Sequence, residues 1–454
     1  MGTCCSRKQK YGTHGNRQIG VCENDSDQVI RGDYGASIRL QGFSGFVSMA
    51  TMQGKKGLNQ DAMTVWEDFT GENEMYFCGV FDGHGPSGHK VSRRVRDQLP
   101  AKLSTVYHHI KITGRSQSDV DAFCDDVDDS NSETREPNSR SVRDADDPVA
   151  DLVFYRWKSS LLRAFREVDQ ELSLDSSIES YCSGSTAVTI VKQGDYLIIS
   201  NLGDSRAVMC SRGEIGQVIA VQLTVDLKPS LGKEAERIRR CKGRVFSLGA
   251  EAHVLRLWLP DEDSPGLAMT RAFGDFCLKS YGLISVPQIF CRKLVEEDEF
   301  VVLATDGIWD VLTNFEVVKI VLSARKRPSA AKLLAVHAIR AWKSRYPSSK
   351  IDDIAVVILF LKPPPLEKSL SDISHVTPDS LSHLNSSISQ YTRRSISSID
   401  ANDVCDVRET NKGKSHNGLS ELGEGESLVD MTLNFPRYSN ARHRSRSMTK
   451  DGDF

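Results

Sequence analysis

Three aspartates of this chain stand next to apolar segments typical of buried strands, and together they could bind a metal ion. They are Asp82 after residues 75–81, Asp306 after residues 300–304 and Asp352 before residues 354–361. Carboxylate oxygens are hard ligands that favour Mg²⁺ or Mn²⁺ over Zn²⁺. Two such ions can clamp a phosphate and lower the pKa of a shared water, so these residues predict a divalent-metal hydrolase.

The first of these aspartates lies in the stretch Asp82-Gly83-His84-Gly85. The Gly83 carbonyl could bind the same ion, and the imidazole of His84 could protonate a leaving oxygen. The alternative is a strand-to-helix turn, in which Asp82 caps a helix and the glycines supply positive φ. Spacing alone does not show that the three aspartates meet in space.

Periodicity predicts the elements that must hold these residues. Apolar runs at 187–191, 196–201 and 206–210, separated by Gly194-Asp195 and Gly203-Asp204, indicate antiparallel strands. Asp204 is either a ligand or a side chain that forms an Asx turn. Apolar residues at helical spacing after Gly88 and over 161–172 indicate helices that pack on a core.

Composition restricts the possible partners and compartment. The net charge of −3 gives no basic field for nucleic acid. Eleven cysteines are scattered singly except for Cys4-Cys5, which favours free thiols in a reducing, intracellular compartment. No apolar run approaches the ~20 residues of a transmembrane helix. Nothing indicates an obligate oligomer, so we expect a monomer.

The composition also changes along the chain, which predicts its domain organisation. The expected parts are a flexible amino-terminal tether (1–42), a globular domain (43–362) with an acidic disordered insertion (113–148), and a disordered Ser-rich tail (363–454).

The amino terminus, Met1-Gly2-Thr3-Cys4-Cys5-Ser6, fits the pattern for N-myristoylation of Gly2. One myristoyl chain binds a membrane only marginally, but palmitate on Cys4 and Cys5 or the basic residues that follow would strengthen the attachment. We therefore expect a peripheral protein on the cytoplasmic face of the plasma membrane. The alternative is a protein of the cytosol or nucleus whose chain happens to begin with Met-Gly.

Eight motifs in order make the chain resemble the PP2C family of metal-dependent Ser/Thr protein phosphatases, and its plant members in particular. They are Asn59-Gln60-Asp61-Ala62, Val80-Phe81-Asp82-Gly83-His84-Gly85, Ser183-Gly184-Ser185-Thr186-Ala187, Asn201-Leu202-Gly203-Asp204-Ser205-Arg206, Asp226-Leu227-Lys228-Pro229, Arg271-Ala272-Phe273-Gly274-Asp275, Ala304-Thr305-Asp306-Gly307-Ile308-Trp309-Asp310 and Asp352-Asp353-Ile354. The resemblance implies an α+β fold, a four-layer αββα sandwich of two antiparallel sheets flanked by helix pairs, with disordered termini.

The resemblance also implies two Mg²⁺ or Mn²⁺ ions per domain, and a third in some members. Its implied ligands are Asp82 as the bridge, the Gly83 carbonyl, Asp306 and Asp352 at the first ion, Asp61 in the outer shell of the second, and Asp204 with Asp306 at the third. The implied reaction is direct attack of a metal-bridging water on phosphoserine or phosphothreonine in a protein substrate. No phosphoenzyme forms, and His84 is the general acid.

Two departures from the family pattern leave an alternative open. Gln60 stands where many members have Glu, and Lys56 stands where many have a phosphate-binding Arg. Lysine supplies the charge without the bidentate fork. The alternative function is a pseudophosphatase, or a membrane-tethered regulator that binds phosphoproteins without hydrolysing them.

Overall fold

The structure is a computed structural model, and it describes residues 29–113, 148–249 and 254–363. The chain divides into two units, Met1–Glu367 and Lys368–Phe454, and every described residue lies in the first. The expected lipidation sites Gly2, Cys4 and Cys5, the acidic insertion between 113 and 148 and almost all of the expected tail lie outside the described residues. No helix in the described ranges is long and apolar enough to cross a bilayer.

The larger of the two main sheets has seven strands in the order β1-β2-β5-β6-β9-β10-β17, and every pair in it is antiparallel. These strands are β1 (Val29–Arg31), β2 (Ser37–Arg39), β5 (Ala62–Glu67), β6 (Tyr76–Phe81), β9 (Ala187–Gln193), β10 (Tyr196–Leu202) and β17 (Gln288–Lys293).

The other main sheet has six strands in the order β12-β11-β18-β19-β4-β3, also antiparallel throughout. These strands are β12 (Val218–Gln222), β11 (Arg206–Arg212), β18 (Asp298–Ala304), β19 (Ile354–Phe360), β4 (Val47–Met52) and β3 (Gly42–Phe43).

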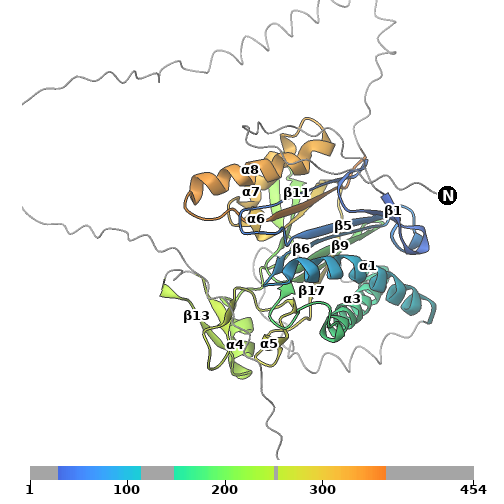
Figure 1. The fold of residues 1–454 in the computed structure, drawn as a ribbon. Coiled ribbons are helices and arrows are strands. Elements are labelled where there is room, and N and C mark those ends of the chain that lie inside the picture. Colours follow the sequence, from blue (N-terminus) through green and yellow to red (C-terminus); the bar gives the residue numbers. More distant parts are fainter. Residues whose placement is uncertain (1–28, 114–147, 250–253, 364–454) are drawn as a thin grey trace, which may run out of the picture. The chain divides into compact units, whose positions relative to one another are not determined.

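Three hydrophobic cores fix these sheets in four layers (Figure 1). The middle core joins the sheets face to face, with Val65 and Val188 from the first and Leu303 and Val357 from the second. Alternate residues of the same strands face the helices, because successive side chains of a strand point to opposite faces. The expected αββα sandwich is therefore confirmed.

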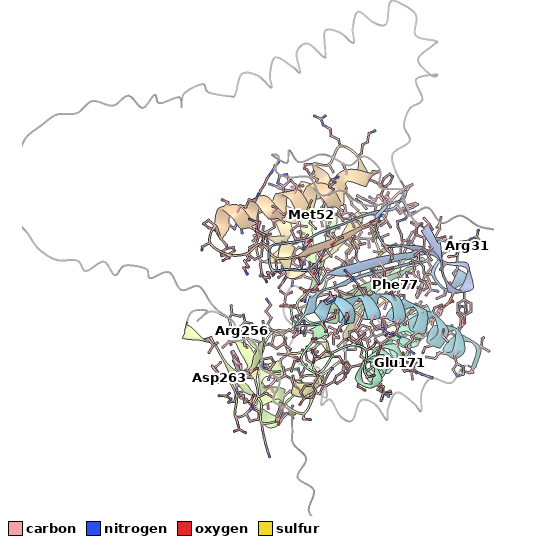
Figure 2. The ribbon with its side chains drawn as sticks, viewed as in Figure 1. Arg31, Met52, Phe77, Glu171, Arg256 and Asp263 are labelled. Carbon is pink, nitrogen blue, oxygen red and sulfur yellow. The ribbon has the colours of Figure 1, made fainter. Side chains whose placement is uncertain are left out.

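The helices are the outer layers, and their apolar stripes explain why they lie there. The first sheet is covered by α1 (Gly88–Thr113) and α3 (Pro148–Leu174), the second by α6 (Asp306–Trp309), α7 (Asn314–Leu322) and α8 (Ala330–Arg345). In the first pair, Trp157 of α3 stacks on Tyr107 of α1 with ring centroids 3.9 Å apart. Figure 2 shows Phe77 in the layer of side chains beside α1 and Met52 beside α8.

Shorter elements complete the unit. They are η1 (Asp33–Gly35), η2 (Phe69–Gly71), η4 (Arg327–Ser329), α4 (Gly232–Arg240), α5 (Phe276–Lys279), the sheet of β13 (Arg244–Phe246), β14 (Arg256–Trp258) and β15 (Pro265–Leu267), and the sheet of β7 (Gly83–His84), β8 (Gly184–Ser185) and β16 (Phe273–Gly274). A separate small core, which includes Ile238 and Leu257, unites α4 with the sheet of β13, β14 and β15.

Two features differ from the sequence prediction. Residues 29–42, expected to be part of the tether, form strands β1 and β2 and the start of β3. These strands are short, and β1 is exposed along its length, so they lack the apolar signal of a core strand. The apolar run 206–210 does not lie in the same sheet as the runs 187–191 and 196–201. Instead β11 belongs to the other sheet, because the turn at Gly203 (φ 102°) carries the chain across.

Candidate active site

A small antiparallel sheet positions Asp82 and His84. The Asp82 N–H donates to Thr186 Oγ1 (3.0 Å), and the Asp82 carbonyl accepts from the Thr186 N–H (2.9 Å). The chain then continues as β7, which pairs with β8, and α1 begins only at Gly88. Asp82 is therefore not the cap of that helix, and the alternative of a simple capping turn is wrong.

The Gly83 backbone is tightly packed on both sides. A Cβ at Gly83 would overlap the carbonyl oxygen of Gly88, so only glycine fits there. The Gln60 side chain adjoins this turn, and its Nε2 donates to the Gly85 carbonyl (2.9 Å). Gln60 thus fastens the turn that follows Asp82.

The other two aspartates come from the second sheet. Asp306 is the first residue of α6, directly after β18 and Thr305. Of the adjacent pair before β19, Asp353 is satisfied by the backbone, since its carboxylate accepts from the Gly54 N–H (2.7 Å) and the Gln60 N–H (2.9 Å). Asp352 instead forms an ion pair with Lys56. The other oxygen of Asp352 accepts from the Asp353 N–H (3.0 Å), so Asp352 has one lysine and one backbone N–H as partners, whereas Asp353 has two backbone N–H partners.

Electrostatic coupling places the carboxylates in one region. Burial, and then the negative charges of Asp306, Asp61 and Asp352, raise the pKa of Asp82 well above its ordinary value. The pKa of Asp306 is raised in the same way, by burial first and then by Asp352 and Asp204. Burial raises the pKa of Asp61 to about 8, although Thr305 Oγ1 donates a hydrogen bond to it (2.7 Å). The negative charges of Asp306 and Asp61 therefore both act on Asp82.

This region fits hard divalent cations by its donor chemistry. Asp204 is almost fully buried, and its Oδ1 has no hydrogen-bond partner among the described residues. Lys228 Nζ lies 3.3 Å from the other oxygen of Asp204. Within residues 29–113, 148–249 and 254–363, no three His, Cys, Asp or Glu side chains alone make up a metal-binding group. A cation held here would also need backbone carbonyls, such as that of Gly83, and water.

His84 has a fixed partner in this site. Its Nε2 lies 2.6 Å from Oδ2 of Asp275, whose side chain is 3% exposed. Burial lowers the pKa of His84, but the charge of Asp275 and its hydrogen bond outweigh that effect, so the pKa is raised overall. The charge of Asp204 also raises it, which links His84 to the carboxylates.

Sequence reasoning missed three residues of this region. Asp275 and Lys228 stand in two of the family motifs, Arg271–Asp275 and Asp226–Pro229, and those motifs were the available signal. Asp310 follows Asp306 at helical spacing, and that spacing was the available signal. Desolvation raises the pKa of Asp310, Lys228 opposes the rise, and Asp204 adds to it.

Comparisons with known proteins identify the family. The family model described as "Protein phosphatase 2C" matches residues 129–344. "Probable protein phosphatase 2C 65" of Arabidopsis thaliana is 49% identical, and the match covers 82% of this chain and 91% of that protein. "Probable protein phosphatase 2C 73" of Oryza sativa subsp. japonica is 48% identical, with 80% and 81% covered.

The fold has a counterpart among solved structures. The serine-threonine phosphatase 2C from Toxoplasma gondii superposes with a TM-score of 0.59 at 23% identity, over 72% of this chain and 99% of that one. The chain therefore belongs to the protein phosphatase 2C family and is a protein serine/threonine phosphatase.

Proposed function

We propose that the enzyme depends on Mg²⁺ or Mn²⁺ and hydrolyses phosphoserine and phosphothreonine in proteins by direct attack of water. The observation that carries this proposal is the state of Asp82, whose pKa is raised by burial and then by the negative charges of Asp306 and Asp61, as expected for a site that cations would complete. Family membership supplies the reaction class.

The ligands that we propose are oxygen atoms. Asp82, the Gly83 carbonyl, Asp306 and Asp352 would hold two ions, Asp61 would contribute through water, and Asp204 would serve a third. Bound ions would supply positive charge to the phosphate and lower the pKa of a water molecule.

Side chains of the protein would supply the proton for the leaving oxygen and a further positive charge for the phosphate. Water forms a bond to phosphorus while the bond from phosphorus to the seryl or threonyl oxygen breaks, and that oxygen keeps the electron pair. His84 gives this oxygen a proton, so the products are a hydroxyl group and inorganic phosphate. Lys56, at the rim beside Asp352, offers a point charge to the phosphate.

The decisive test is metal-dependent release of phosphate from a phosphothreonine peptide by the full chain. We expect Mn²⁺ to support the reaction, EDTA to stop it, and Asp82→Asn to lower kcat by at least about 10³-fold, as for loss of a main electrostatic group. Asp195→Asn, in the exposed turn between β9 and β10, is the matched control and should behave as wild type. A wild-type protein that binds the peptide but is no faster than Asp82→Asn would support the pseudophosphatase instead.

We also propose that the amino terminus attaches the enzyme to the cytoplasmic face of the plasma membrane. The support is the pattern at Gly2, with Cys4 and Cys5 as sites for a second acyl chain. Gly2→Ala should move the protein from the membrane fraction to the soluble fraction, and replacement of both cysteines by Ser should weaken attachment. An unchanged distribution of Gly2→Ala would refute the proposal.

A further inference from the structure

The sheet of β7, β8 and β16 brings together two side chains that are 191 residues apart in the chain. In this sheet His84 pairs with Gly184 on one side, and Gly274 pairs with Gly184 on the other. The central strand therefore separates His84 from the strand that leads directly to Asp275. Because the intervening residue is a glycine, the two side chains can meet across it.

Gly184 is required for this contact by its lack of a side chain. A Cβ at Gly184 would overlap Oδ2 of Asp275 and lie 2.6 Å from Nε2 of His84. The constraint is steric, since the backbone of Gly184 is not in the left-handed region. Any larger residue at this position would push the imidazole and the carboxylate apart.

The Asp275 carboxylate is held rigidly. Its backbone has φ 49°, an uncommon conformation for a residue with a side chain, and its N–H donates to the Ser183 carbonyl (2.9 Å). Behind it, the Asp169 carboxylate accepts from the Gly274 N–H (2.9 Å) and from Lys279 Nζ (2.8 Å). The N–H groups of Gly274 and Asp275 are thus both hydrogen-bonded, which fixes the segment of backbone that carries the Asp275 carboxylate.

The two ring nitrogens of His84 have different surroundings. Nε2 contacts Asp275 at 2.6 Å, whereas Nδ1 is buried and has no hydrogen-bond partner among the described residues. A carboxylate that binds one nitrogen of an imidazole fixes the ring orientation and leaves the other nitrogen for the reaction.

We propose that Asp275 is a positioning residue, which holds Nε2–H of His84 so that Nδ1 is the atom that protonates the leaving oxygen. This inference rests on the proposed function. As the bond between phosphorus and the seryl or threonyl oxygen breaks, the proton on Nδ1 passes to that oxygen, which has kept the electron pair. The attacking water later returns a proton to Nδ1, so the ring is regenerated while its bond to Asp275 persists.

The test uses two substrates that differ in their need for a proton donor. The alkoxide of phosphothreonine must be protonated as it leaves, whereas p-nitrophenyl phosphate releases a stable phenolate. We expect Asp275→Asn to lower kcat on a phosphothreonine peptide by about 10²-fold and on p-nitrophenyl phosphate by less than about threefold. His84→Gln should give the same pattern, and the double variant should be no slower than His84→Gln, since the two residues act as a unit.

An independent variant keeps both side chains. Gly184→Ala should separate them and reproduce the substrate selectivity of Asp275→Asn, while Gly45→Ala, at an exposed position with open space around it, should match wild type. Nitrogen-15 NMR of the wild-type protein, at a pH where the His84 ring is neutral, should show the proton on Nε2. This last measurement needs no variant and so does not depend on how well the variants fold.

The proposal would be overturned by an equal loss on both substrates in Asp275→Asn, by additive losses in the double variant, or by a neutral ring with its proton on Nδ1. Selective loss in His84→Gln without loss in Asp275→Asn would refute the role of Asp275 while leaving the proposed function intact. A wild-type enzyme inactive on both substrates would instead refute the proposed function.

Discussion

Two regions of the molecule bury acidic side chains, and they differ in how those charges are neutralised. Glu234 of α4 accepts hydrogen bonds from Thr270 Oγ1 (2.6 Å), Arg271 Nη2 (2.6 Å) and Arg237 Nη2 (2.7 Å). Burial would raise the pKa of Glu234, but the hydrogen bonds from these arginines lower it to about 2. Burial together with neighbouring carboxylates drives the pKa of Asp82 in the opposite direction.

The difference separates a structural cluster from a functional one. Around Glu234 the positive charges come from arginine side chains of the protein. Their hydrogen bonds, with that of Thr270, join α4 to the segment that carries Thr270 and Arg271. Around Asp82 the protein gathers like charges, and Lys56 and Lys228 offset only part of their repulsion, so the pKa of Asp82 stays raised. Perturbed pKa values of this kind mark functional sites. Substitutions in the first cluster should therefore lower the stability of the fold, and substitutions in the second should weaken cation binding.

The largest expected effect comes from breaking the satisfied cluster. Arg271→Leu removes the guanidinium that contacts both oxygens of Glu234, so we expect the free energy of unfolding to fall by about 3–5 kcal/mol. Urea unfolding monitored by circular dichroism measures it. Arg163→Leu, which breaks a surface pair with Glu167, is the control and should cost less than about 1 kcal/mol. Equal losses in the two variants would show that the buried Glu234 cluster contributes no more to stability than a surface ion pair.

The same cluster predicts how stability depends on acid. Because the folded pKa of Glu234 is about 2 and the ordinary value is 4.5, its stabilising contribution is complete above pH ~5 and is lost as the pH falls toward 2. The shift corresponds to about 3 kcal/mol at neutral pH. The difference in unfolding free energy between wild type and Glu234→Gln should therefore shrink between pH 6 and pH 3. A constant difference across that interval would show that the carboxylate charge is not the cause.

The cation-binding cluster should respond to metal instead. Mn²⁺ at about 100 times its Kd should stabilise the folded wild type by about 2.7 kcal/mol. Asp82→Asn removes one of the repelling charges, so we expect it to unfold at a higher temperature than wild type without metal and to gain little from Mn²⁺. Glu234→Gln should keep the full response to Mn²⁺. Calorimetry with and without Mn²⁺ measures the response of Asp82→Asn and of Glu234→Gln. A full response in Asp82→Asn would count against Asp82 as a ligand of the ion.

Much of the fold and part of the site could be predicted from sequence because their signals are local. Apolar runs that end at Asp82 and Asp306 mark strands that stop at a polar edge, and helical spacing marks the faces of α1 and α3. The pair of His84 and Asp275 has no such signal, because two-residue strands carry no periodicity. Its geometry depends on Gly184, which lies about 90 to 100 residues from each partner. The edge strands β1 and β2 escaped detection for a related reason, since they bury too little to show alternation.

The smallest effect that we predict concerns Gln60, which lies between the carboxylates and the backbone that supports them. Its Nε2 donates to the Gly85 carbonyl, and a glutamate cannot donate this bond. Both Gln60→Glu and Gln60→Ala should therefore lose about 1 kcal/mol of stability without metal.

Metal should then separate these two variants. Gln60→Glu adds a negative charge near Asp82, in a region that cations complete, so its stabilisation by Mn²⁺ should exceed that of wild type. Gln60→Ala adds no charge, and its stabilisation by Mn²⁺ should equal that of wild type. Titration of the thermal midpoint with Mn²⁺ measures both. If the two variants respond alike, Gln60 acts on the Gly85 turn alone, and an extra charge at this position does not reach the ions.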